Sequence, residues 1–228
     1  MKAWRLNFRM WMLLITGALI AATGIYFGQE FLHILPLFIS LFVMLLQTQA
    51  NRYAFLLGGL NSMLYSVVYI AMQLYANAVY SFLFSGCLQI ITFFNWKKHA
   101  YGKSTVLRRL TNPQRWMVAG IFLVGWVGLN LALSGTDASL AKRLLDNASS
   151  VLGTITTFVS MLSFMEYPAL QLISAIIGFP MYFILLMEDP AQTTFFIYHI
   201  YSTICVCLSL RTVRALYSYQ QEERNHID

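Results

Sequence analysis

The longest uncharged run in the chain extends from Tyr53 to Trp96, 44 residues without an Asp, Glu, Lys or Arg. It is bounded by Arg52 and Lys97. An α-helix rises about 1.5 Å per residue, so about 20 residues cross the hydrocarbon core of a bilayer. The run therefore predicts two membrane-crossing helices joined by a turn near Gln73 to Asn77.

A second run of the same length, from Tyr167 to Leu210, lies between Glu166 and Arg211. Its only charges, Glu188 and Asp189, stand near the middle, where a turn is expected. This run predicts a second helical hairpin.

The composition excludes an ordinary soluble protein. Hydrophobic residues make up 58% of the 228-residue chain and charged residues 11%, against about 25% charged residues in soluble domains. We therefore predict an all-α polytopic membrane protein with one membrane domain.

The net charge of +6 comes from basic residues at the ends of apolar runs, where they set membrane topology, so no nucleic-acid partner is expected. The chain has three cysteines, Cys87, Cys205 and Cys207, and no two of them form a Cys-x-x-Cys pair. No disulfide framework, metal site or cofactor is therefore expected.

Eight transmembrane helices are expected. The run from Met10 to Gln29 is longer than the apolar core of a signal peptide, and its small-x-small triplet Ala22-Thr23-Gly24 lies inside the run, so we interpret it as the first span. The chain then divides into five parts: residues 1–30 with the first span, 31–96 with spans two to four, 97–143 with a basic loop and span five, 144–210 with spans six to eight, and the tail 211–228.

The basic residues predict the orientation. The loop from Lys97 to Arg115 contains six basic residues and no acid. With eight spans, all of the 15 Lys and Arg residues except Lys142 and Arg143 fall on the side of this loop. By the positive-inside rule that side is the cytoplasm. We therefore expect a protein of the bacterial cytoplasmic membrane with both termini in the cytoplasm.

Spans two to four and six to eight follow the same plan of a helix, a charged junction and a 44-residue helical hairpin, offset by 113 to 114 residues. One span separates the two units, so both run in the same direction. This predicts 3+1+3 parallel repeats related by an axis along the membrane normal, preceded by one extra helix. Transporters built in this way hold their substrate between the halves, midway through the membrane.

Three short stretches are similar to the first repeat of the PnuC family of vitamin transporters. They are Asn61-Ser-Met-Leu-Tyr-Ser-Val-Val-Tyr, Gln73-Leu-Tyr-Ala-Asn and Leu88-Gln-Ile-Ile-Thr-Phe-Phe-Asn-Trp96. The second repeat resembles the family in outline, with Asp146 and then Glu166-Tyr-Pro-Ala-Leu-Gln-Leu-Ile-Ser174. The resemblance covers about Phe31 to Leu216.

The resemblance implies a SWEET-like bundle that imports nicotinamide riboside, thiamine or another vitamin by facilitated diffusion, with cytoplasmic phosphorylation trapping the product. Members that carry nicotinamide riboside place two tryptophans and an asparagine in span seven, where this chain has Tyr167, Leu170 and Ser174. The cargo therefore stays open among nicotinamide riboside, thiamine, riboflavin and other nucleosides. Relatives of this architecture assemble as trimers, which makes a homotrimer an expectation of the resemblance.

Polar side chains inside the expected spans are the candidates for substrate binding, because a polar group in hydrocarbon needs a partner or a ligand. Amides beside aromatic rings suit a flat, hydrogen-bonding vitamin or nucleoside. The alternative is that these side chains form hydrogen bonds between helices and only hold the bundle together. For His199 the alternative is a neutral ring whose N–H is bonded to a backbone carbonyl. The candidates are Asn61, Tyr65, Gln89, Trp126, Asn130, Gln171, Ser174 and His199.

Residues at span ends carry further expectations. Trp96 and Trp116 are predicted to lie at the membrane interface, and Glu166 is predicted to be solvated. Gly58 and Gly59 predict close packing or bending of span three.

Two other classes of function are alternatives to transport. An intramembrane enzyme would need a nucleophile with a base, or a metal motif such as His-Glu-x-x-His, and the four histidines are widely separated, so no catalytic residue is assigned. A non-transporting receptor or partner subunit is the main alternative, and its cavity would be absent or closed. With no membrane-embedded carboxylate to bind an ion, passive transport is favoured over ion-driven transport.

Overall fold

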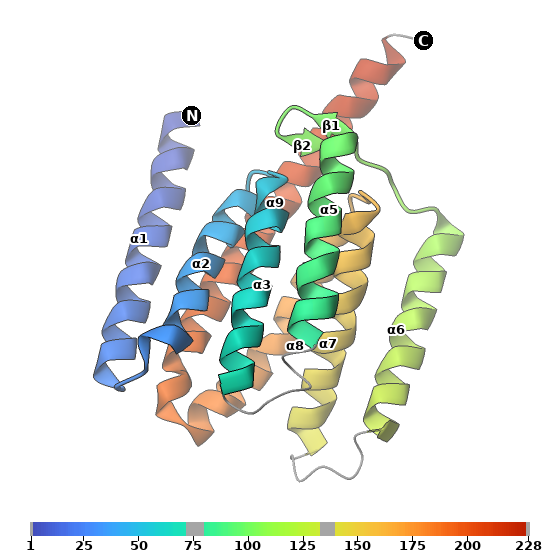
Figure 1. Ribbon diagram of the computed structural model, residues 1–228. Coiled ribbons are helices and arrows are strands. Elements are labelled where there is room, and N and C mark those ends of the chain that lie inside the picture. The colour runs from blue at the N-terminus through green and yellow to red at the C-terminus, as the bar shows by residue number, and fades with distance from the viewer. Residues whose placement is uncertain (1, 72–79, 133–139, 227–228) are drawn as a thin grey trace.

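The computed structural model describes residues 2–71, 80–132 and 140–226. Eight α-helices lie in these ranges, which confirms the all-α prediction (Figure 1). The turn predicted near Gln73 to Asn77 falls outside the described residues. The helices are α1 (Lys2–Tyr26), α2 (Phe31–Gln47), α3 (Tyr53–Ala71), α5 (Cys87–Lys98), α6 (Asn112–Ala132), α7 (Leu140–Met161), α8 (Tyr167–Glu188) and α9 (Thr193–Asn225).

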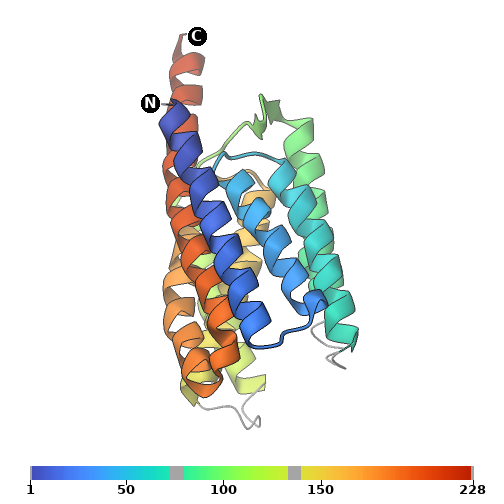
Figure 2. The same cartoon turned by 90° about the vertical axis from the view of Figure 1, so that its left-hand side faces the viewer.

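Three short elements complete the described chain. A π-helical segment η1 (Tyr80–Gly86) leads into α5, and a 3-10 turn η2 (Pro190–Gln192) joins α8 to α9. Strands β1 (Ala100–Tyr101) and β2 (Ser104–Thr105) pair antiparallel in the basic loop. We call this pair the ribbon. The ribbon and both chain termini lie at one end of the bundle, the ribbon end (Figures 1 and 2).

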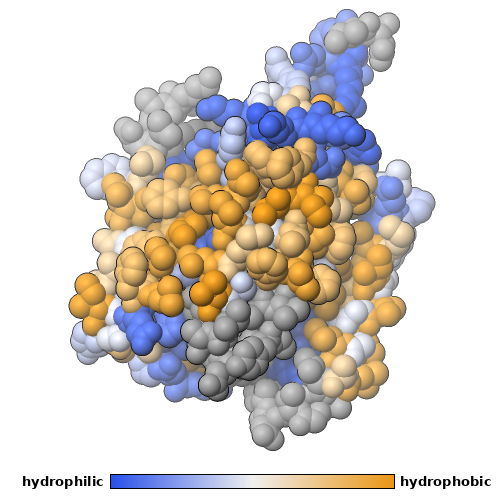
Figure 3. Space-filling model, in the orientation of Figure 1, coloured by the Kyte–Doolittle hydropathy of each residue, from blue (hydrophilic) through white to orange (hydrophobic). Residues whose placement is uncertain are grey.

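The surface fits a membrane. In the described part of the chain, four helical segments are long and apolar enough to cross a membrane: Phe8–Tyr26, Asn112–Ala132, Tyr167–Glu188 and Pro190–Asn225. Figure 3 shows apolar residues in a belt around the middle of the visible face, with hydrophilic residues at the ribbon end. α6 is the extreme case, since it has no buried residue and Trp116 is 79% exposed. A surface of this kind is stable against lipid but not against water.

Two apolar clusters hold the bundle together. The first joins α1, α2 and α9 through residues such as Leu41, Tyr201 and Val206. The second lies at the ribbon end and is built around Trp96, which is 0% exposed. The prediction that Trp96 lies at the membrane interface is therefore wrong. Its Nε1 donates to the Ser160 carbonyl at 2.8 Å, so a partner 64 positions away in the chain holds the ring inside the protein.

The basic loop is an ordered cap over the ribbon end. The Gln220 side chain from α9 accepts from Leu107 N and donates to Thr105 O, both at 2.9 Å. Arg52 N, at the start of α3, donates to Lys103 O at 3.0 Å. The loop therefore connects α9 with the junction between α2 and α3.

Glu166 is not simply solvated, as the sequence suggested. Its carboxylate accepts from Leu110 N at 3.2 Å and pairs with the Arg115 guanidinium at 3.3 Å. A charged partner and a backbone donor from the basic loop draw this side chain into the cap.

The turns that end α2 and α7 have the same geometry. Ala50 (φ 50°) and Ser163 (φ 61°) occupy the left-handed region 113 positions apart. In each turn the next residue donates to the carbonyl five positions earlier, at 3.2 Å and 3.1 Å. This is the usual way to end a helix on a left-handed residue.

The ends of α2 and α7 also make similar contacts. The Thr212 hydroxyl of α9 donates to Thr48 O at the end of α2, at 2.8 Å. Asn95 of α5 correspondingly donates to Met161 O at the end of α7. In each case a helix that is distant in the chain satisfies a carbonyl at a helix end.

Candidate functional site

A cavity with many polar lining residues lies among helices α2, α3, α5, α7, α8 and α9. Its first chamber, of about 290 Å³, is lined from α2, α3, α5, α7 and α8. A second chamber, of about 220 Å³, is lined from α2, α7, α8 and α9. Gln171 and Ser174 line both chambers, so the chambers adjoin along α8.

Three glutamines from three helices meet at the first chamber: Gln47 of α2, Gln89 of α5 and Gln171 of α8. Gln171 Nε2 donates to Gln47 Oε1 at 3.2 Å. Amides can both donate and accept, so this wall offers both kinds of hydrogen bond to a ligand.

Gln89 is held in position by its neighbours. Its Nε2 donates to the hydroxyls of Ser62 and Ser85, at 3.2 and 3.1 Å. A methyl group at Gly58 would overlap Gln89 Oε1. At Gly59 a methyl group would approach the Gly86 carbonyl to 3.0 Å. The two glycines therefore serve close packing between α3 and α5, and Gly58 provides the space that the Gln89 amide occupies.

α7 contributes a row of hydroxyl groups to the first chamber, from Thr156, Thr157 and Ser160. Thr157 and Ser160 bond to carbonyls of their own helix. Thr156 Oγ1 is buried and has no hydrogen-bond partner in the described protein, and the same is true of Ser149 Oγ beside the second chamber. An unsatisfied buried hydroxyl costs about 1–3 kcal/mol, which a bound ligand or water would recover.

Aromatic rings close the first chamber toward the ribbon end. Phe55 and Tyr167 line it, and both pack edge-on against Trp96, with ring centroids 4.7 and 5.9 Å away. These three rings lie in the apolar cluster at the ribbon end. The chamber is therefore separated from that end by buried aromatic side chains.

His199 lines the second chamber. Its Nε2 lies 2.9 Å from the Ala175 carbonyl, and its ring lies 4.5 Å from the ring of Tyr182. A Cβ at Gly178 would come within 3.0 Å of the imidazole, so this glycine allows α8 to pass close to it. The histidine is thus capped by a carbonyl and also forms part of the cavity wall.

Among the described residues that line the two chambers, none has a charged side chain, and amides, hydroxyls and one imidazole supply the polar surface. Among the described residues no group of three or more His, Cys, Asp or Glu could hold a metal ion.

The structure brings four of the eight predicted site residues to this cavity: Gln89, Gln171, Ser174 and His199. Tyr65 lines neither chamber. Asn61 is buried between α2 and α3, where its Nδ2 donates to Pro36 O at 3.0 Å and to Ser40 Oγ at 2.8 Å.

The two candidates on α6 also lie away from the cavity. Trp126 Nε1 donates to Leu144 O at 3.0 Å. Asn130 accepts from Asn147 Nδ2 at 2.9 Å. Both contacts attach α6 to α7, so in this structure they join helices.

Several lining residues were not singled out from the sequence. Gln47 lies at the end of span two, and Thr156 and Thr157 lie in span six. The sequence signal that could have identified them is a polar side chain inside an apolar run. Phe55 could not be found in this way, because one phenylalanine among 17 carries no distinguishing pattern.

An all-helical bundle with an apolar belt and a cavity lined by polar groups is compatible with a membrane transporter. The family model of the nicotinamide mononucleotide transporters matches residues 30–212. The chain therefore belongs to this family, which confirms the resemblance to PnuC drawn from the sequence.

The fold is similar to that of a crystal structure described as the vitamin B3 transporter PnuC. The TM-score is 0.74 at 16% sequence identity, and the match covers 93% of this chain and 92% of that one. A search of curated proteins finds no match.

Proposed function

We propose that the chain is a membrane facilitator that carries a small, flat, water-soluble vitamin or nucleoside through the cavity between its two halves. The observation that carries this proposal is the uncharged polar lining of two adjoining chambers. Together the chambers are large enough for a ligand of this size. The glutamine amides would fix the orientation of the cargo, and the rings of Phe55 and Tyr167 would pack against its flat face.

The cargo enters without a phosphate group. A phosphate ester carries about −1.5 to −2 charges at neutral pH and is usually bound by Arg or Lys. The described residues of the cavity lining include neither Arg nor Lys. The family description names a nucleotide, but this lining favours an unphosphorylated compound such as nicotinamide riboside or thiamine.

The chain crosses the membrane eight times as two parallel three-helix repeats, with α6 as the linker and α1 as the extra helix. The matching turns at Ala50 and Ser163 support this arrangement. The ribbon end faces the cytoplasm of a bacterial cell, because the basic loop and tail lie there.

Transport proceeds by alternating access. The rings of Phe55, Trp96 and Tyr167 close the cytoplasmic side, and a rocking motion of the two repeats would separate them. No described lining residue is a carboxylate that could hold a driving ion, so the proposed movement is passive, and phosphorylation in the cytoplasm retains the product. The proposed activity is therefore transport rather than catalysis.

Binding to matched pairs of compounds tests the proposal. Isothermal titration of the purified chain would compare nicotinamide riboside with its mononucleotide and thiamine with its monophosphate. We expect one unphosphorylated compound to bind at least about 100-fold more tightly than its phosphate ester, because the ester would bury an uncompensated charge. Tighter binding of the ester would contradict the proposed cargo. Binding without transport would point to a receptor.

A further inference from the structure

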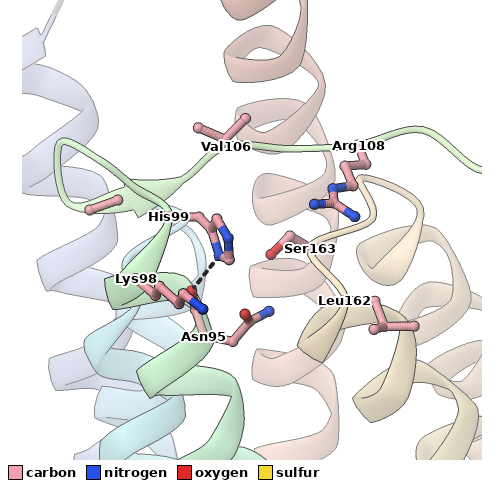
Figure 4. Close-up of a pocket in the computed structure, with 8 residues that line it drawn as sticks. Asn95, Lys98, His99, Val106, Arg108, Leu162 and Ser163 are labelled. Atoms are coloured by element: carbon pink, nitrogen blue, oxygen red, sulfur yellow. Dashed lines mark hydrogen bonds between the residues drawn. The ribbon is translucent and has the colours of Figure 1, made fainter.

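A separate cavity of about 380 Å³ lies at the ribbon end, outside the transport cavity (Figure 4). Its walls come from the end of α5 (Asn95, Lys98 and His99), from Arg108 of the basic loop and from Ser163 in the turn after α7. It shares no lining residue with either chamber of the transport cavity.

The cavity is positively charged. Lys98 and Arg108 line it, and none of the lining residues that the structure describes is acidic. Within the described part of the chain neither forms an ion pair. The carboxyl ends of α5 and α7 oppose them with about −0.5 charge each, which is less than the two full charges. Some of these carbonyls are also already bonded, Met161 O to Asn95 and Ser160 O to Trp96.

Ser163 provides an unused hydroxyl. The residue is 4% exposed, and its Oγ has no hydrogen-bond partner in the described protein. Figure 4 shows this hydroxyl directed into the space between His99 and Arg108. The matching turn 113 positions earlier has Ala50 in the same conformation, so the turn itself does not need a hydroxyl.

The backbone of the walls is fixed before any ligand arrives. Arg108 N donates to Ser163 O at 2.9 Å and Arg108 O accepts from Met165 N at 2.8 Å, which holds the arginine backbone against the turn. His99 Nδ1 lies 3.1 Å from Asn95 O, and its carbonyl accepts from Val106 N at 2.9 Å. The backbone that carries Arg108 and His99 is therefore ordered, while the exposed side chains of Lys98 and Arg108 would become ordered on binding.

We propose that this cavity binds a phosphate-bearing anion. Arg108 would contact the phosphate oxygens with its planar fork of donors, Lys98 would add a point charge, and the Ser163 hydroxyl would donate the hydrogen bond that it lacks. A soluble phosphomonoester and the headgroup of an anionic phospholipid share this chemistry, and the experiment distinguishes these two sources.

The test uses the full chain in lipid nanodiscs. In discs of zwitterionic lipid, titration with inorganic phosphate and adenosine monophosphate measures soluble ligands. In discs containing phosphatidylglycerol, native mass spectrometry measures retained anionic lipid. The double variant Lys98→Gln with Arg108→Gln should lower affinity or retention at least about tenfold, since charge-assisted hydrogen bonds are the strong ones. The matched control is Lys97→Gln with Arg109→Gln, which removes the same charge from neighbours that do not line the cavity, and it should change either signal less than about twofold.

Ser163→Gly provides a second variant that keeps the left-handed turn and removes the hydroxymethyl side chain. It should weaken binding several-fold without lowering the melting temperature, so it carries the test if the double variant does not fold. Saturable binding of a soluble phosphate would identify a soluble ligand, and retention of phosphatidylglycerol alone would identify a lipid site. Equal losses in the double variant and its control would reduce the site to a diffuse basic surface. That result, or no binding in either arm, would overturn the proposal.

Discussion

At the scale of single residues, Gly58 controls the position of Gln89. We predict that Gly58→Ala displaces the Gln89 amide from its space beside α3. Cargo affinity should fall about tenfold, equivalent to one lost hydrogen bond, while the fold is retained because a flexible side chain can move aside. Gly120→Ala on α6 is the matched control, since nothing lies within 4 Å of the added methyl. Unchanged affinity in Gly58→Ala, measured by titration calorimetry, would show that Gln89 does not contact the cargo.

The hydroxyl of Thr156 has no partner in the described protein, so we predict that its removal raises the stability of the empty protein and weakens cargo binding. Thr156→Val removes a buried polar atom without a partner, so the empty protein should gain about 1 kcal/mol of stability. The same variant should bind cargo more weakly. Thr92→Val, outside the cavity and bonded to Leu88 O at 2.7 Å, should lose stability and keep its affinity. Thermal unfolding and calorimetry check both; a destabilised Thr156→Val would show that the hydroxyl has a partner.

Part of the cavity lining could be predicted from the sequence for a physical reason. Gln89, Gln171 and His199 are strongly polar groups in apolar runs, so their need for a partner is visible without a structure. The same criterion cannot tell a ligand-facing amide from one that joins two helices, as Asn61 does with Pro36 and Ser40. That difference depends on which helices become neighbours.

At the scale of elements, Gln220 anchors the ribbon. Its side chain is 3% exposed and bonds to two backbone groups of the loop. Gln220→Ala would leave Thr105 O and Leu107 N without their partner, which should cost about 2 kcal/mol. We expect a lower melting temperature and faster proteolysis between residues 99 and 110. Gln221→Ala, one position further on, should change neither, and equal effects of the two variants would show that the anchor is not specific.

The helices could be predicted because the charged residues and apolar runs of each segment mark where that helix begins and ends. The runs Tyr53–Trp96 and Tyr167–Leu210 predicted α3, α5, α8 and α9. The ribbon, the buried position of Trp96 and the pairing of Glu166 with Arg115 could not be predicted in this way. Each depends on partners that are distant in the chain, such as Ser160 O for Trp96.

At the scale of the whole molecule, the orientation in the membrane can be tested by labelling. We predict that Arg109→Cys, at the ribbon end, is protected from a membrane-impermeant maleimide in intact cells and reacts after permeabilisation. Asp189→Cys, at the opposite end, should react in intact cells. Both residues are exposed, and the background would be a variant in which the native cysteines are replaced. The reverse pattern would invert the proposed topology.

The most direct test of the central claim is uptake into proteoliposomes of the unphosphorylated compound that binds best. We predict saturable uptake down its concentration gradient, unchanged by an imposed proton gradient and lost in Gln89→Ala and Gln171→Ala. Asn130→Ala on α6 should retain uptake, because this residue lies outside the cavity. Absence of uptake by folded protein that binds the compound would contradict a facilitator and identify a receptor, and uptake that depends on the proton gradient would contradict passive transport.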